Sequence, residues 1–135
     1  MKILIIYGKT DLTHSRRAVT NFTFALAKYA PEHEYYLQAD LDPLPQELTQ
    51  VDFDAIILDV TFVGRGRWYG YDHLHQILKK YSFIKKSNAF KIALPQDDYT
   101  NSELLDKWMK YWNVDVIFSP CYKQKQVLFP ESSAK

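Results

Sequence analysis

The segment Ala93-Leu-Pro-Gln-Asp-Asp-Tyr-Thr-Asn-Ser102 carries an apolar run directly into a doubly acidic turn. Apolar side chains then recur at helical spacing from Leu104 to Trp112. A strand that leads through a polar turn into a helix is the repeating unit of an open α/β sheet, and ligands bind such sheets at the carboxyl ends of the strands. The segment therefore predicts a fold class and the place of a site.

The same alternation runs along the whole chain. Short apolar runs predict strands at 3–7, 34–38, 54–60, 90–94 and 114–118, and helical periodicity predicts helices at 18–29, 74–81 and 104–112. Thr100 and Glu103 have the spacing of a capping box. The pattern predicts a Rossmann-like three-layer α/β/α sandwich with a mostly parallel sheet of about five strands. Three glycines within Gly64–Gly70 predict a loop.

The length of 135 residues fits one domain. We expect this domain to occupy residues 1–120, with 121–135 as a tail or the start of a linker to a second domain. Within the tail, 127–129 is apolar enough for a further strand or a strand stub.

The net charge of +1 gives no overall attraction to nucleic acid, so no nucleic-acid partner is expected. Residues 64–91 nevertheless carry seven basic and one acidic side chain. This run is either the solvated face of a helix or a patch for anionic lipid or phosphate, which would allow peripheral membrane contact through 79–91. A single cysteine excludes an internal disulfide, and the first apolar run is too short for a signal sequence or a membrane span. A cytoplasmic location is expected. If the basic run binds lipid, the protein would lie at the inner face of the membrane.

Known phosphate motifs do not fit the loop after the first strand. Gly8-Lys-Thr10 lacks the earlier glycine of a phosphate-binding loop, because that position holds Ile3, and one glycine is too few for a dinucleotide fingerprint. Lys9, Thr10 and His14 still lie where an anionic group could be received, the alternative being a solvated loop. No metal site is predicted, since His73 and His75 are spaced i, i+2 and fall on different sides of a helix.

The acidic turn has two interpretations. Asp97 or Asp98 could simply favour the start of the following helix through its dipole. Alternatively Gln96, Asp97, Asp98 and Tyr99 could bind the hydroxyls of a sugar, with Trp68 stacking on the sugar face. The second interpretation requires both carboxylates to lie open to solvent, beside the glycine segment that carries Arg65 and Arg67.

These residues resemble a family, the amino-terminal, acceptor-side domain of bacterial two-domain glycosyltransferases of the retaining GT-B type (glycosyltransferase family 1/4-like). The turn Gln96-Asp97-Asp98-Tyr99 is similar to the Gln-Asp-Glu-aromatic turn of that family. Many relatives carry a histidine where this chain has Asp59. The resemblance covers the chain from the first strand to Ser119 and rests on the segments Phe53–Leu58, Gly66–Trp68, Lys91–Tyr99, Glu103–Asp106 and Val114–Ser119.

The resemblance implies that the domain holds a glycan or lipid-linked sugar acceptor in glycan or polysaccharide biosynthesis. It also implies a second, donor-binding domain that this chain of 135 residues does not include. The nucleotide-sugar donor is expected only with that second domain, so no cofactor is expected here and the isolated domain is expected to be inactive. The implied substrate-binding residues are Gln96, Asp97, Asp98, Tyr99, Arg65, Arg67 and Trp68, with no catalytic residue assigned. The alternative is a flavodoxin-like binding or regulatory module without catalysis.

Overall fold

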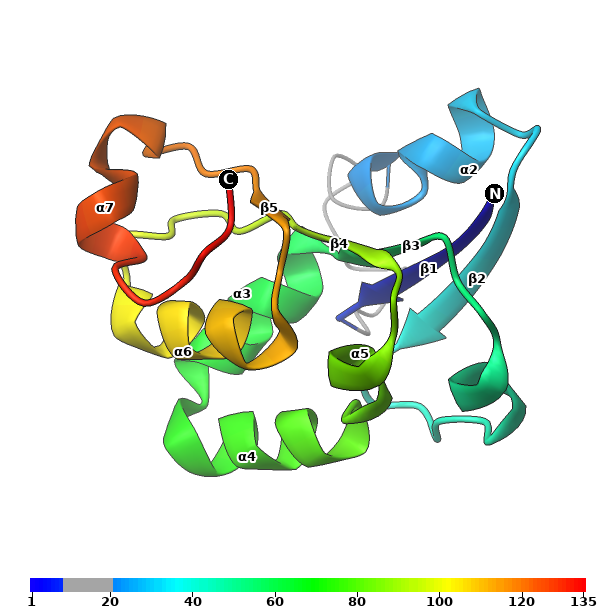
Figure 1. Cartoon of the computed structure of the whole chain (residues 1–135), viewed down its shortest axis with the longest axis horizontal. Helices are drawn as coiled ribbons and strands as arrows, with labels where there is room; N and C mark the ends of the chain where they lie inside the picture. The colour runs from blue at the N-terminus through cyan, green and yellow to red at the C-terminus, as the bar shows by residue number, and fades with distance from the viewer. Residues whose placement is uncertain (9–20) are drawn as a thin grey trace.

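The computed structural model describes residues 1–8 and 21–135, with the backbone alone at 65–67. It is an α/β fold built on a five-stranded, all-parallel sheet with the strand order β2-β1-β3-β4-β5 (Figure 1). The strands are β1 (Lys2–Tyr7), β2 (Glu34–Ala39), β3 (Ala55–Leu58), β4 (Phe90–Ala93) and β5 (Val116–Ile117). The fold class predicted from the sequence is confirmed, and each strand falls within or beside its predicted range.

The two faces of this sheet can be told apart by residue parity. Successive side chains of a strand point to opposite faces, so Leu4 and Ile6 share one face with Ile56 and Leu58, their partners in register. Ile5 and Ile57 are paired in the same way on the other face. Both faces are therefore apolar, as is usual for parallel sheets, which are generally covered on both faces.

Most helices lie on the face of Leu4 and Ile56, which we call the packed face (Figure 1). They are α3 (Val60–Trp68), α4 (Gly70–Lys80), α5 (Phe83–Lys86) and α6 (Ser102–Trp112). The main core forms between these helices and the sheet and includes Phe62, Trp108 and Trp112. The Phe62 ring meets the Trp108 ring edge-on at 5.1 Å between centroids, and Trp108 lies 5.5 Å from Trp112. The apolar stripe predicted for 104–112 is thus buried.

The opposite face, which we call the open face, is covered over β1 by α2 (Ala25–Tyr29). Its buried apolar cluster is small, consisting of Ile3, Ile5 and Ile57, with Ile92 and Leu94 partly buried beside them. At its far side Phe118 is 63% exposed and Phe90 is 50% exposed. Within the described residues, the β4 and β5 half of this face has no helix above it (Figure 1).

The prediction of a loop at Gly64–Gly70 is wrong, because residues 60–68 form α3 and a new helix starts at Gly70. The Asp59 side chain accepts the Thr61 N–H and caps the helix. Phe62 and Val63 in its first turns are buried in the main core. A glycine costs a helix only about 1 kcal/mol, which the cap and this burial outweigh.

The predicted capping box is also wrong. Helix α6 begins at Ser102 after Asn101, whose φ of 52° is left-handed and whose side chain makes no cap hydrogen bond. The Glu103 carboxylate accepts instead from Lys107 Nζ at 2.7 Å and from the Tyr71 hydroxyl at 3.1 Å. Glu103 therefore links α6 to α4 and does not cap its own helix.

The tail is helical where a strand or stub was expected, since Lys125–Leu128 forms α7 after the short 3-10 turn η2 (Tyr122–Gln124). Phe129 and Ala134 then enter the main core. The Lys135 N–H donates to the Asp115 carbonyl at 2.8 Å, beside β5. The boundary placed at residue 120 stays a prediction, although the tail packs against the domain. A further 3-10 turn, η1 (Glu47–Gln50), precedes β3.

None of the helices in the described part of the chain is both long and apolar enough to cross a membrane.

Candidate functional site at the carboxyl edge of the sheet

The strand order defines a switch point between β1 and β3. From β1 the chain proceeds to β2 on one side, whereas β3, β4 and β5 follow one another on the other side. In open α/β sheets this reversal leaves a crevice outside the carboxyl ends of the two central strands, where ligands bind. Here those ends are Tyr7 and Leu58, followed by Gly8 and Asp59.

Gly8 is held tightly against the start of α3. Its N–H donates to Thr61 Oγ1 at 2.8 Å, and a Cβ placed on Gly8 would lie 2.6 Å from the Thr61 carbonyl oxygen. A side chain is therefore excluded at this position unless the backbone moves. The glycine that ends the first strand is required by the close approach of β1 to α3.

Asp59 is the central polar residue of the switch point. The residue is 2% exposed, and its carboxylate accepts the Thr61 N–H at 2.9 Å, the Thr61 hydroxyl and, from across the sheet edge, the Thr23 hydroxyl at 3.2 Å. No functional role was predicted for Asp59, Thr61 or Thr23 from the sequence. An aspartate directly after an apolar strand is the available signal, because Asp is a preferred N-cap of the helix that follows.

The turn Gln96–Tyr99 also lies at this edge, after β4. Gln96, Asp97 and Tyr99 are exposed, and Asp97 has a left-handed φ of 53°. This backbone turn directs the two neighbouring carboxylates differently. Asp98 is fully buried, so the expectation that both carboxylates lie open to solvent is wrong for Asp98.

The buried Asp98 links the turn to the loop after β5. Its Oδ2 accepts the Ser119 hydroxyl, and Ser119 Oγ in turn accepts the Cys121 N–H at 2.9 Å. Burial and the neighbouring Asp98 carboxylate raise the pKa of the Cys121 thiol. Asp98 thus positions the turn, and Gln96, Asp97 and Tyr99 are the residues of the turn that are exposed at its surface.

The other predicted site residues are only partly described. Lys9, Thr10 and His14 lie outside the described residues, as do the side chains of Arg65 and Arg67. Trp68 is 62% exposed at the end of α3. The expected proximity of the acidic turn to the arginines therefore stays a prediction.

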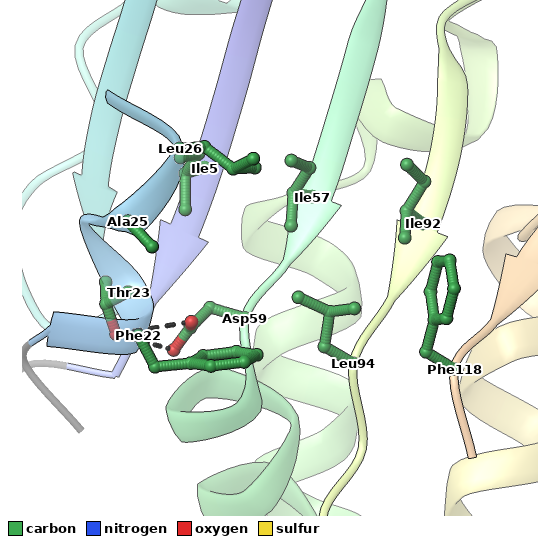
Figure 2. A pocket seen from close by; sticks show the side chains of 10 residues that line it. All are labelled: Ile5, Phe22, Thr23, Ala25, Leu26, Ile57, Asp59, Ile92, Leu94 and Phe118. Atoms are coloured by element: carbon green, nitrogen blue, oxygen red, sulfur yellow. Dashed lines mark hydrogen bonds between the residues drawn. The ribbon is translucent and has the colours of Figure 1, made fainter. Parts of the chain in front are cut away.

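A cavity opens on the open face just beside the switch point (Figure 2). Asp59 and Thr23 are its polar lining residues, and its volume is about 520 Å³. The remaining lining is apolar and consists of Ile5, Phe22, Ala25, Leu26, Ile57, Ile92, Leu94 and Phe118. Within the described residues there is no group of three or more His, Cys, Asp or Glu side chains that could hold a metal ion.

Comparison of the chain with protein-family models, curated proteins and solved structures found no match. The structure shows a Rossmann-like parallel α/β domain. A glycosyltransferase function is therefore put forward below as a proposal.

Proposed function

We propose that this chain is the acceptor-side domain of a GT-B-type glycosyltransferase that acts in glycan or polysaccharide biosynthesis. The observation that carries the proposal is the turn Gln96–Tyr99, which follows β4 at the carboxyl edge of a parallel sheet with three of its four side chains exposed. Amide, carboxylate and aromatic groups are the ones that bind sugar hydroxyls and sugar faces.

The roles within this turn follow from burial. The Gln96 amide would donate hydrogen bonds to sugar hydroxyls and accept them, and the Asp97 carboxylate would accept them. The Tyr99 ring, 65% exposed, would pack against a sugar face. Asp98 would hold the turn in this shape through Ser119. The nucleotide-sugar donor would need a second domain, because stabilising the departing diphosphate requires charged groups placed on the donor side of the cleft.

The first experiment tests sugar binding at the turn. Maltose, cellobiose and chitobiose are titrated into the ¹⁵N-labelled chain, and amide shifts are followed by NMR. We expect at least one disaccharide to shift amides of residues 94–101, and Asp97→Asn or Gln96→Ala to weaken that binding. Asp52→Asn, an exposed carboxylate that precedes β3, is the matched control and should bind as the wild type does. Saturable binding elsewhere on the chain, or none at all, would contradict the proposal.

The second experiment tests catalytic incompleteness. The isolated chain is incubated with UDP-glucose and each disaccharide, and UDP release is measured. We expect no release above that of a buffer control. Turnover by the 135 residues alone would contradict the assignment of donor chemistry to another domain.

The alternative, a flavodoxin-like binding or regulatory module, is favoured by one observation. The order β2-β1-β3-β4-β5 is the flavodoxin-like order of doubly wound sheets. A flavin absorbance spectrum in the purified chain, together with no disaccharide binding, would support this alternative.

A further inference from the structure

The cavity on the open face has the size and lining of a small-molecule site. Its volume of about 520 Å³ falls within the usual range for ligand pockets, roughly 300–1,000 Å³. It lies over β1, β3 and β4, with α2 along one side and Phe118 on the other (Figure 2). Ile5 and Ile57 form its buried floor.

The rim of the cavity presents apolar side chains to solvent. Phe22 is 52% exposed, Leu26 44% and Phe118 63%. Phe22 lies shortly before α2, Leu26 lies within α2, and Phe118 directly follows β5, so they border the same hollow from two sides. Covering them with an apolar group removes their surface from water, which is favourable in proportion to the area covered.

One buried carboxylate provides the polar end of this site. Asp59 Oδ1 is saturated, because it accepts from the Thr61 N–H, from the Thr61 hydroxyl and from Thr23. Among the described residues, Oδ2 accepts only from the Thr23 hydroxyl, at 3.2 Å, and that hydroxyl is shared with Oδ1. A carboxylate oxygen can accept about two hydrogen bonds, so Oδ2 retains capacity for a donor. All of the Asp59 partners in the described structure are neutral.

The chemistry of a complementary ligand follows from these two features. Its body must be apolar to match the aliphatic and aromatic walls. Its head must donate hydrogen bonds to Asp59, and a positive charge complements a buried carboxylate that has no cationic partner among the described residues. An anionic amphiphile is disfavoured, since it would place its negative head beside the buried Asp59 carboxylate.

We propose that this cavity binds a small organic ammonium ion, with its alkyl or aryl body over Ile57 and its head at Asp59. The site is separate from the acidic turn after β4 and does not depend on the proposed glycosyltransferase function. The cavity lies over the face of the sheet, and its Asp59 end adjoins the β1–β3 switch point, the edge at which open parallel sheets bind ligands.

The test uses three probes with the same apolar chain: octylammonium, 1-octanol and octanoate, each below its aggregation limit. Binding to the full chain is measured by calorimetry and by ¹⁵N amide shifts. We expect octylammonium to bind roughly ten-fold or more tightly than 1-octanol, as for a hydrogen bond to a charged group, and octanoate to bind most weakly. The amide shifts caused by octylammonium should include those of Thr23, Asp59 and Thr61.

Two variants separate the head from the body of the ligand. Asp59→Asn keeps the side-chain shape and a good N-cap for α3, and it should abolish the preference for octylammonium over 1-octanol. Phe118→Ser changes an exposed residue and should weaken the binding of octylammonium and of 1-octanol several-fold. It should leave the preference for octylammonium unchanged. Asp52→Asn is the control for a general loss of negative charge and should change neither property.

Three results would overturn the proposal: equal affinity for octylammonium and 1-octanol in the wild type, a preference that persists in Asp59→Asn, or no saturable octylammonium binding. If Asp59→Asn does not fold, the three-probe comparison on the wild-type chain and the location of its amide shifts decide the question.

Discussion

The packed face and the open face of the sheet are equally apolar in sequence but differ in what covers them. Leu4, Ile56 and Leu58 lie under helices α3 to α6, whereas the open face has α2 over β1 and leaves Phe118 and Phe90 largely exposed. The stability of this chain should therefore come mostly from one face. The other face is available for binding.

The largest predicted effect contrasts one aromatic residue on each face. Trp108 is fully buried between Phe62 and Trp112, so Trp108→Ala should lower the free energy of unfolding by about 3–5 kcal/mol. Phe118→Ala, on the open face, should change it by no more than about 0.5 kcal/mol. Urea denaturation followed by circular dichroism measures both. Similar losses in the two variants would mean that the open face is buried in solution.

The next effect concerns the attachment of α3 to the sheet edge. Gly8→Ala should destabilise by about 1–3 kcal/mol, because its Cβ would lie 2.6 Å from the Thr61 carbonyl oxygen. Gly64→Ala is the matched control, since a Cβ there meets nothing within 4 Å inside the helix. It should stabilise by about 0.5–1 kcal/mol. The same denaturation measurement applies, and a neutral Gly8→Ala would contradict the close approach.

A smaller effect compares the two neighbouring aspartates, one turned inward and one outward. Asp98→Asn replaces a charge-assisted hydrogen bond from Ser119 with a neutral one and should cost about 1 kcal/mol. Asp97→Asn should stay within about 0.5 kcal/mol, because asparagine tolerates the left-handed φ of 53°.

The same pair of variants has a chemical readout. Because Asp98 contributes to the raised pKa of Cys121, Asp98→Asn should lower that pKa and speed thiol modification near pH 8. The chain has one cysteine, so a disulfide reagent that releases a coloured thiolate reports on Cys121 alone. Asp97→Asn should react like the wild type. Equal rates in all three proteins would mean that Asp98 does not act on the thiol.

The smallest effect lies on the outer surface of the packed layer and depends on pH. Hydrogen bonds from Lys107 and Tyr71 lower the pKa of Glu103, and Lys110 lowers that of Glu131, from a usual value of 4.5. Depressed carboxyl pKa values stabilise the fold above pH 4.5, and this contribution is lost as the pH falls through the lower, folded-state values. The double variant Glu103→Gln, Glu131→Gln should therefore lose less thermal stability than the wild type between pH 5 and pH 3.

Salt provides the control for this last comparison. Both pairs are exposed at the surface, so 1 M NaCl should reduce the difference between the wild type and the double variant. The single variant Glu47→Gln, at an exposed position in η1, should follow the wild-type pH dependence. A double variant indistinguishable from the wild type at every pH would show that the two pairs contribute nothing to stability.

Local sequence patterns were sufficient for the sheet and for the buried stripe of α6. β-branched runs such as Ile3–Ile6 and helical periodicity at Leu104, Leu105 and Trp108 are properties of neighbouring residues, so they could be recognised without the fold. The glycine segment was misassigned for the opposite reason. Its helix depends on Asp59 as a cap and on Phe62 packing against Trp108, a residue distant in the chain.

The candidate site shows the same division. The position of the acidic turn after β4 could be predicted, because the carboxyl ends of parallel strands share one edge. The inward rotation of Asp98 could not, since it follows from a left-handed Asp97 and from Ser119 on the neighbouring loop. The contact between Thr23 and Asp59, which are 36 positions apart, carried no local signal either.

The sequence by itself determined that this chain forms a parallel α/β sheet with polar turns at its carboxyl edge, because strand and helix periodicity are written in local side-chain order. Only the tertiary structure decided which face of that sheet is covered, which aspartate is buried and where the Asp59 cavity opens. Those outcomes depend on pairs of residues that are far apart in the chain, and their packing and hydrogen bonds exist only after the chain has folded.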